Sequence, residues 1–207
     1  FVVSTVLLFF LGFSRYYQVR YVRQDEMVQG VIGGAGPLPV QSTYWRFLDS
    51  LHPHNEGQLM KINTEMSRRV WAAGKVKLKR IYLDTDSTMN TVYGDQMGAR
   101  KGYNLRRRGA KGLQPLLSFV AETGECVRGK QHNGSSANGE EMAEHITAAM
   151  RSMGERVEEV VGRMDAGFYA KEVVEAIESL GKGYSYLIVA QKTSALVRAL
   201  EAADWKQ

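Results

Sequence analysis

The sequence predicts an α/β fold, a mixed sheet flanked by helices, preceded by an all-α N-terminal region. Two observations predict it. Up to about residue 76 the apolar residues recur at helical spacing, with no clear strand. From Lys77 onward, short apolar runs alternate with amphipathic stretches in the order strand, hairpin, helix, strand, helix, strand, helix. That order indicates an α/β domain with a mixed sheet.

The N-terminal region begins with an apolar stretch, Phe1 to Phe13. This stretch is too short to span a membrane and lacks the basic start of a signal peptide, so we expect a buried helix. A loop rich in Gly and Pro covers residues 30–39. Two further helices are predicted, one starting at Ser42-Thr43 and one over residues 56–73. The apolar face of the latter comprises Leu59, Ile62, Met66 and Val70.

The second region contains a hairpin signal, Glu122-Thr123-Gly124, between two short strands. Near its end, the pattern strongly predicts a helix over residues 170–180, followed by Gly181. In the predicted helix over residues 139–153, His145 is expected on the polar side. The predicted strands are 78–86, 116–121, 125–130, 157–164 and 184–189, and the predicted helices are 139–153, 170–180 and 194–203. This is also the element order of the ribonuclease H-like fold, so we expect a helical region over 1–76 and a ribonuclease H-like core over 77–207.

Composition narrows the function only a little. The 27 Lys and Arg against 22 Asp and Glu give a formal charge of +5, a mild lean toward a polyanionic partner. The single cysteine, Cys126, excludes a disulfide framework within the chain and fits a reducing compartment such as the cytoplasm. The start at Phe1 and the end at Gln207 suggest a fragment cut at both ends.

Acidic residues close the first predicted strand. Asp84 and Asp86 project from the same face of a strand, and the repulsion between two such carboxylates is relieved by a bound cation. The alternative is that Asp86-Ser87-Thr88 is only a polar turn, and both interpretations remain open.

A second acid, Asp165, follows the strand at 157–164, and Gly167 permits a sharp entry into the next helix. Ligands of open α/β sheets bind at the carboxyl ends of strands, where this aspartate lies. The alternative is a helix cap near Ala170. Taken together, these carboxylates are hard oxygen ligands that suit Mg²⁺ or Mn²⁺ and not zinc.

A basic segment lies between the first two strands of the core. No acid occurs between Asp95 and Glu122, while six cations fall within twelve residues. Contact with phosphates explains such a one-sided run, and a solvated loop is the alternative. The candidate phosphate-binding residues are Arg100, Lys101, Arg106, Arg107, Arg108 and Lys111.

Several short motifs follow one another between about residues 40 and 195. They are Ser42-Thr43-Tyr44-Trp45-Arg46-Phe47-Leu48, Leu83-Asp84-Thr85-Asp86-Ser87-Thr88, Tyr93-Gly94, Gly102-Tyr103-Asn104, Pro115-Leu116-Leu117-Ser118-Phe119, Glu122-Thr123-Gly124-Glu125 and Asp165-Ala166-Gly167-Phe168-Tyr169. In their order and spacing, these motifs resemble the DDE transposases of bacterial insertion sequences.

The resemblance implies a metal-dependent enzyme that cuts and joins DNA. Asp86 looks like the first catalytic aspartate, with Asp84 as the competing choice, and Asp165 looks like the second. Two Mg²⁺ or Mn²⁺ ions held there would activate water, or a DNA 3′-hydroxyl, for attack on a phosphodiester. The implied partner is double-stranded DNA, namely terminal inverted repeats and target DNA, with a possible homodimer on DNA, no membrane, and a place near the bacterial nucleoid.

The family also has a third acid, a glutamate on a later helix. Glu201 follows Asp165 by 36 positions, a spacing that some DDE enzymes use. We favour instead a glutamate beyond Gln207, in which case this piece would bind metal weakly and cleave poorly. The rival hypotheses are a ribonuclease H-like nuclease without strand transfer, an inactive remnant that only binds DNA, and a basic membrane-surface protein anchored by Phe1 to Phe13.

Overall fold

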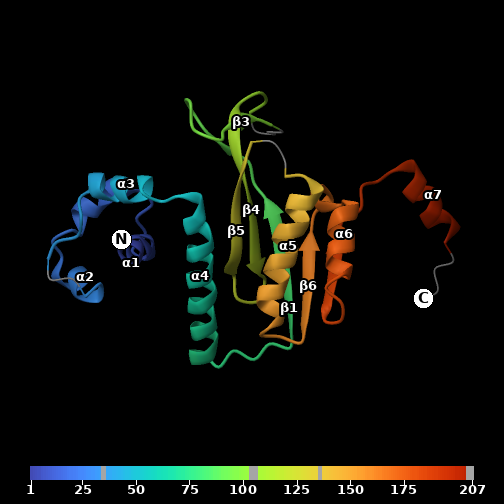
Figure 1. Ribbon diagram of the computed structural model, residues 1–207, viewed down its shortest axis with the longest axis horizontal. Coiled ribbons are helices and arrows are strands. Elements are labelled where there is room, and N and C mark those ends of the chain that lie inside the picture. Colours follow the sequence, from blue (N-terminus) through green and yellow to red (C-terminus); the bar gives the residue numbers. More distant parts are fainter. Residues whose placement is uncertain (34–35, 103–106, 135–136, 204–207) are drawn as a thin grey trace. The chain divides into compact units, whose positions relative to one another are not determined.

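The computed structural model describes residues 1–33, 36–102, 107–134 and 137–203 (Figure 1). The chain divides into two compact units, residues 1–61 and 62–207. The long helix α4 (Pro53–Ala73) crosses this boundary. The sequence placed the change of pattern at residue 77, but the C-terminal half of α4 belongs to the second unit because Trp71 packs in the core of that unit. No helix in the described ranges has the length and apolar character that crossing a membrane requires.

The first unit is helical, as the sequence predicts. Before α4 it contains α1 (Val2–Phe10), the 3₁₀ helix η1 (Tyr16–Tyr21), α2 (Glu26–Val31) and α3 (Gln41–Asp49). Its core includes the buried Tyr44, whose hydroxyl donates to Ser4 Oγ over 2.9 Å. The other buried apolar side chains of this core are Leu8, Val19, Val28 and Leu38.

The prediction that the apolar start forms a buried helix is only half right. Helix α1 is present, but Ser4 and Leu8 are its only buried residues. Phe9 and Phe10 are 59% and 85% exposed. The physical reason is that a helix packed against a small core buries one stripe, so the remaining apolar side chains stay on the surface.

The second unit is built on a seven-stranded mixed sheet. The strands are β1 (Arg80–Ser87), β2 (Asn90–Thr91), β3 (Arg100–Lys101), β4 (Lys111–Val120), β5 (Glu125–Asn133), β6 (Glu159–Met164) and β7 (Tyr184–Ile188). Strand β4 runs antiparallel to β1 on one side and to β5 on the other, whereas β1, β6 and β7 run parallel. This is the arrangement of the ribonuclease H-like fold, and it confirms the predicted fold class.

The predicted hairpin joins β4 and β5. The chain reverses through Ala121–Gly124, where Gly124 takes a positive φ of 69° that glycine adopts without steric cost. Both strands run further than predicted, because β4 continues back to Lys111, where its first residues pair with β2 and β3 beyond the end of β1.

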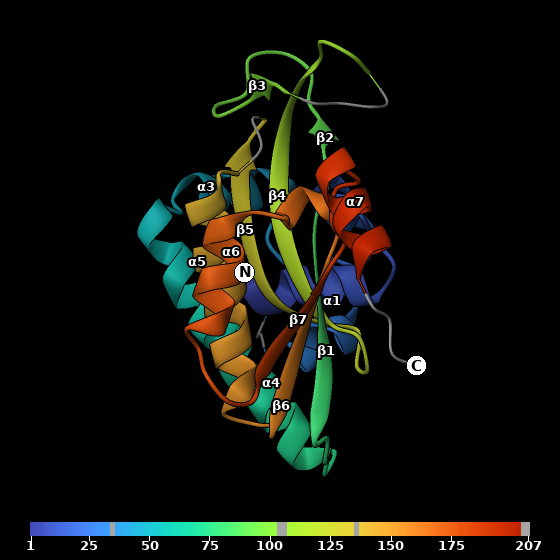
Figure 2. The same cartoon turned by 90° about the vertical axis from the view of Figure 1, so that its right-hand side faces the viewer.

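Helices α5 (Gly139–Gly154) and α6 (Lys171–Glu178) cover one face of this sheet, and Figure 2 shows them on the same side of it. The predicted stripe of α5 packs on the sheet, with Ile146 and Met150 fully buried. Asn138 starts α5 with a capping box to Glu141. Helix α7 (Ser194–Ala202) follows β7 and has no buried residue.

One sequence expectation about a helix face is wrong. His145 was expected on the polar side of α5, but it is fully buried and hydrogen-bonds Ser118 in β4. The apolar stripe of α4 does not pack on the sheet unit, since Ile62, Met66 and Val70 are 49%, 55% and 65% exposed. The packed face of α4 carries Ser67 and Trp71 instead, because polar partners on β5 and in the turn after α5 hold that face. The indole of Trp71 donates to Glu125, and Arg156 donates to Ser67.

Candidate active site

The two candidate aspartates lie at the same end of two neighbouring parallel strands. The pairing of β1 with β6 runs up to Thr85 opposite Met164, so Asp86 and Asp165 are the next residue of each strand. Both carboxylates are exposed. Within β1, Ile81, Leu83 and Thr85 are buried under the helices, and the alternating residues therefore face the other side of the sheet, which we call the open face.

Local backbone geometry holds one oxygen of each carboxylate. Asp86 Oδ1 accepts a hydrogen bond of 2.7 Å from the Ser87 amide. Asp165 Oδ1 accepts one of 2.9 Å from the Gly167 amide, and this bond caps the 3₁₀ helix η2 (Ala166–Phe168). The capping alternative is thus partly right for Asp165: it caps a 3₁₀ turn and not α6, whose N-cap is Ala170.

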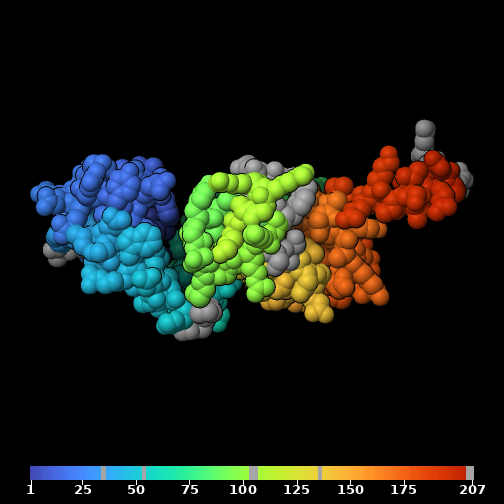
Figure 3. All heavy atoms as spheres, turned by 90° about the horizontal axis from the view of Figure 1, so that it is seen from above, coloured from blue at the N-terminus to red at the C-terminus, as the bar shows by residue number. Residues whose placement is uncertain are grey.

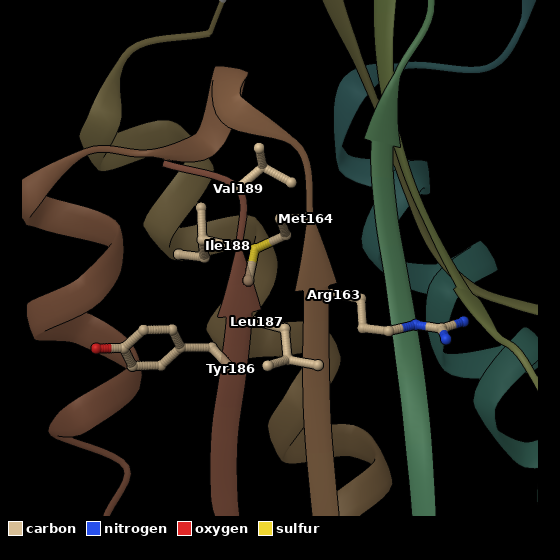
Figure 4. Close-up of a pocket in the computed structure, with 6 residues that line it drawn as sticks. All are labelled: Arg163, Met164, Tyr186, Leu187, Ile188 and Val189. Carbon is tan, nitrogen blue, oxygen red and sulfur yellow. The ribbon is translucent and has the colours of Figure 1, made fainter. Parts of the chain in front are cut away.

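Asp84 has a different environment from Asp86. Its two oxygens accept from Arg163, with Nε to Oδ1 at 2.6 Å and Nη2 to Oδ2 at 2.7 Å. The two residues are direct partners in the β1–β6 register. The guanidinium also lies 5.0 Å from the centre of the Tyr82 ring. Figure 4 shows the Arg163 side chain reaching from β6 across β1. Both oxygens of Asp84 are therefore engaged by one cation.

Behind the aspartates, the covered face of the sheet carries a chain of buried polar side chains. Thr85 Oγ1 and Ser118 Oγ lie 2.8 Å apart, and Ser118 Oγ lies 3.0 Å from His145 Nε2. All three residues are buried. These hydrogen bonds link β1 to β4 and to α5 at the residue between Asp84 and Asp86, and so they fix the register of the strand that carries both acids.

Among the described residues, no third carboxylate lies with Asp86 and Asp165. Glu201 lies on the exposed helix α7. In the part of the chain that the structure describes, no group of three His, Cys, Asp or Glu side chains is arranged to hold a metal ion. The structure thus brings Asp86 and Asp165 to adjacent positions, and it places neither Glu201 nor Asp84 with them as a third ligand.

The chemistry of this pair fits a magnesium-type cation. Mg²⁺ is usually held by one or two carboxylates, with water and substrate phosphate filling the remaining positions. Asp86 and Asp165 are exposed oxygen donors on adjacent strands, and neither has an opposite charge paired to it among the described ion pairs. Two acids suffice for one ion, whereas a two-ion site needs further oxygen ligands.

The basic segment lies at the same end of the sheet as these aspartates. The pairing of β4 passes from Ser87 opposite Leu116 to Asn90 opposite Leu113, so the segment continues beyond the carboxyl end of β1. Figure 3, viewed from above, shows this green segment at the surface of that end. Arg106 lies outside the described residues, as do Tyr103 and Asn104. The exposed described cations are Arg100, Lys101, Arg107, Arg108 and Lys111.

Some of the positive charge of the basic segment is engaged by residues that precede it in the sequence. Lys111 Nζ lies 2.9 Å from Asp95 Oδ1. Arg107 donates to the Tyr93 hydroxyl over 2.9 Å, and its guanidinium lies 5.3 Å from the centre of that ring. The one-sided run of cations is therefore less repulsive than the sequence suggests, because Asp95 reaches Lys111 from sixteen residues earlier.

Sequence reasoning missed Arg163 and His145. A signal for Arg163 was present, because in a strand it shares a face with Asp165 two residues later. Arg163 also borders a hollow of about 480 Å³ along the edge strand β7, whose other lining residues are Met164, Tyr186, Leu187, Ile188 and Val189 (Figure 4). No local signal reveals that His145 turns inward, since its partner Ser118 lies 27 positions away.

Two transposases are among the solved structures to which this chain shows a similarity. The piggyBac transposase synaptic complex with hairpin DNA shares 10% identity over 91% of this chain and 42% of that chain, with a TM-score of 0.47. The catalytic domain of Mos1 mariner transposase shares 11% identity over 76% of this chain and 77% of that one, with a TM-score of 0.38. This chain thus spans less than half the length of the piggyBac transposase chain.

The comparison with curated proteins gives no match. The sequence model of the family described as "Transposase DDE domain group 1" matches residues 2–206, which is nearly the whole chain. The chain belongs to the DDE transposase domain family, group 1.

Proposed function

We propose that this chain forms the catalytic core of a DNA transposase, in which Asp86 and Asp165 hold a divalent metal ion against a DNA phosphodiester. The observation that carries the proposal is the register of β1 and β6, which puts the two exposed aspartates next to each other at one end of the sheet. Membership of the DDE transposase family supports the same reaction class.

The roles of the side chains follow from their hydrogen bonds. The amides of Ser87 and Gly167 each fix one oxygen of a carboxylate, so the other oxygen of Asp86 and of Asp165 is available for Mg²⁺ or Mn²⁺. When bound, such an ion lowers the pKa of the attacking water or hydroxyl and stabilises the leaving oxygen. The buried chain through Thr85 ties β1 to β4 and so holds the strand that carries Asp86 in place.

The proposed substrate is double-stranded DNA, both the terminal repeats of an element and its target. The exposed cations of the basic segment lie at the same end of the sheet as the aspartates and would contact phosphates next to the cleaved bond. Pairing of two element ends would use a homodimer on DNA, and the proposed setting is the bacterial nucleoid.

The test combines metal binding with cleavage. Mn²⁺ binding followed by electron paramagnetic resonance should weaken at least about tenfold, or about 1.4 kcal/mol, in Asp86→Asn and in Asp165→Asn. Nicking of supercoiled plasmid in Mn²⁺ should be lost in both variants. Glu175→Gln, an exposed carboxylate on α6, is the matched control and should change neither quantity. Metal binding and nicking that survive both aspartate substitutions would overturn the assignment.

A second candidate function is an inactive remnant that only binds DNA. The observation that favours it is that no third acidic side chain joins Asp86 and Asp165 in the described part of the chain. The same assays separate the two candidates: the remnant binds duplex DNA and Mn²⁺ without nicking the plasmid in any metal ion.

A further inference from the structure

One cation occupies the open face of the sheet close to the two aspartates. Arg163 lies on the same face of β6 as Asp165, two residues before it, which is about 7 Å along a strand. Its partner Asp84 has the same relation to Asp86 on β1. A DNA strand whose phosphate reaches Asp86 and Asp165 can therefore bring a neighbouring phosphate to this guanidinium.

The Arg163 guanidinium is held in place by Asp84, but some of its N–H donors remain available for another ligand. Asp84 takes Nε and Nη2 in a two-pronged pair, and the Tyr82 ring lies against it at 5.0 Å. An arginine carries five N–H donors, so this pair leaves donors for another anion. The Arg163 side chain is 43% exposed, which gives a ligand access to those donors. Planar arginine donors suit phosphate oxygens.

A contribution to the stability of the fold does not by itself explain the ion pair between Asp84 and Arg163. The carboxylate of Asp84 is 46% exposed, and exposed ion pairs contribute little to the stability of a fold. The charge pattern offers a better explanation. Three carboxylates, Asp84, Asp86 and Asp165, would repel an approaching phosphate, and Arg163 cancels the charge of the one that is not needed for metal.

We propose that Arg163 binds a phosphate of the DNA strand beside the one held at Asp86 and Asp165, and that Asp84 is the positioning residue that fixes this arginine. The inference rests on the proposed function of the two aspartates. It also resolves the competition between Asp84 and Asp86: the former orients a cation, and the latter holds the metal.

The chain supplies a matched control for Arg163. Arg80 and Glu159 form a second ion pair between the same two strands, with Nε to Oε2 at 2.6 Å. They are the direct partners at the other end of the β1–β6 register. Arg80→Gln removes the same charge from the same face of the sheet, four residues further from the aspartates.

The first test measures the salt dependence of DNA binding. A fluorescent duplex oligonucleotide is titrated with each full-chain variant by anisotropy over a series of salt concentrations. We expect Arg163→Gln to weaken binding and to lower the slope of log affinity against log salt by about 0.9, which corresponds to one lost phosphate contact. Arg163→Lys should keep the slope, and Arg80→Gln should match the wild type. Equal slopes for Arg163→Gln and Arg80→Gln would overturn the proposal.

The second test separates positioning from metal binding. Asp84→Asn removes a negative charge, which by itself strengthens DNA binding. A positioning role predicts weaker binding in the wild-type background and stronger binding when Arg163→Gln is already present. Mn²⁺ affinity in Asp84→Asn should stay within about threefold of the wild type, whereas Asp86→Asn loses it. A loss of Mn²⁺ binding in Asp84→Asn equal to that in Asp86→Asn would make Asp84 a ligand and refute its positioning role.

The two proposals can fail separately. If neither Asp86→Asn nor Asp165→Asn affects Mn²⁺ binding, the metal site is wrong. The salt slopes of Arg163→Gln and Arg80→Gln are measured without metal, so they still decide whether Arg163 contacts a phosphate.

Discussion

The two faces of the central sheet in the second unit differ in burial: one face is packed under helices, and the other carries exposed charged residues. On the covered face, Leu83 is fully buried beneath α5 and α6. On the open face, one residue along the same strand, Asp84 is paired with a cation and Asp86 is exposed. Strand alternation therefore assigns stability and chemistry to neighbouring residues. The comparison implies that substitutions on one face should unfold the protein, while those on the other should change binding and leave the fold intact.

The largest effect is expected in the apolar core. Leu83→Ala should lower the free energy of unfolding by about 2–5 kcal/mol, because it leaves a cavity in a packed interior. Leu187→Ala makes the same change on the open face, where Leu187 is 59% exposed, and should stay within about 0.5 kcal/mol. Urea denaturation measures both values. Equal losses would show that the open face is also packed, and the contrast between the faces would break down.

A pH-dependent effect is expected from the buried polar chain. Burial, then the positive charges of Arg128, His132 and Lys130, lower the pKa of His145 to about 4, and Glu144 opposes them. The unfolded chain binds a proton near pH 6.5, so stability should be full above that pH and fall as pH drops from 6.5 to 4. The loss at about 1.4 kcal/mol per pKa unit is about 3 kcal/mol.

His145→Gln should remove this slope between pH 5 and 6.5, which urea melts of both proteins at matched pH can show. The same slope in His145→Gln would place the responsible proton on another group.

A slightly smaller effect is expected from metal on the open face. Mn²⁺ at about one hundred times its Kd should raise the free energy of unfolding by about 2.7 kcal/mol, and a chelator should reverse this. Asp86→Asn should abolish the gain and leave the metal-free stability unchanged, because the carboxylate is exposed. Thermal melts with and without Mn²⁺ test this. A gain that persists in Asp86→Asn would put the bound metal elsewhere.

The smallest effect is expected from the exposed ion pairs of the open face. Arg80→Gln and Arg163→Gln should leave the urea midpoint unchanged at physiological salt, since solvent and salt screen both pairs. Their difference should emerge only when DNA is present. A clear loss of stability in Arg163→Gln alone would assign this arginine to the fold and would weaken its role in binding.

Local patterns in the sequence determined the order of the secondary-structure elements and several of their features. The order of strands and helices, the hairpin at Gly124 and the buried stripe of α5 all follow from periodicity and turn residues, which act over a few positions. The same holds for the position of Asp86 and Asp165 at the ends of two strands. The family resemblance pointed to the same two residues, and their catalytic role stays a prediction.

Only the tertiary structure decided how distant segments meet. It paired Asp84 with Arg163, 79 positions away, and so gave Asp84 and Asp86, which competed in the sequence, different surroundings. It turned His145 inward to Ser118, exposed much of α1, and packed α4 through Trp71 instead of through its apolar stripe. These four outcomes share one physical reason. The environment of a side chain depends on strand register and on the available core area, and neighbouring residues in the sequence determine neither of them.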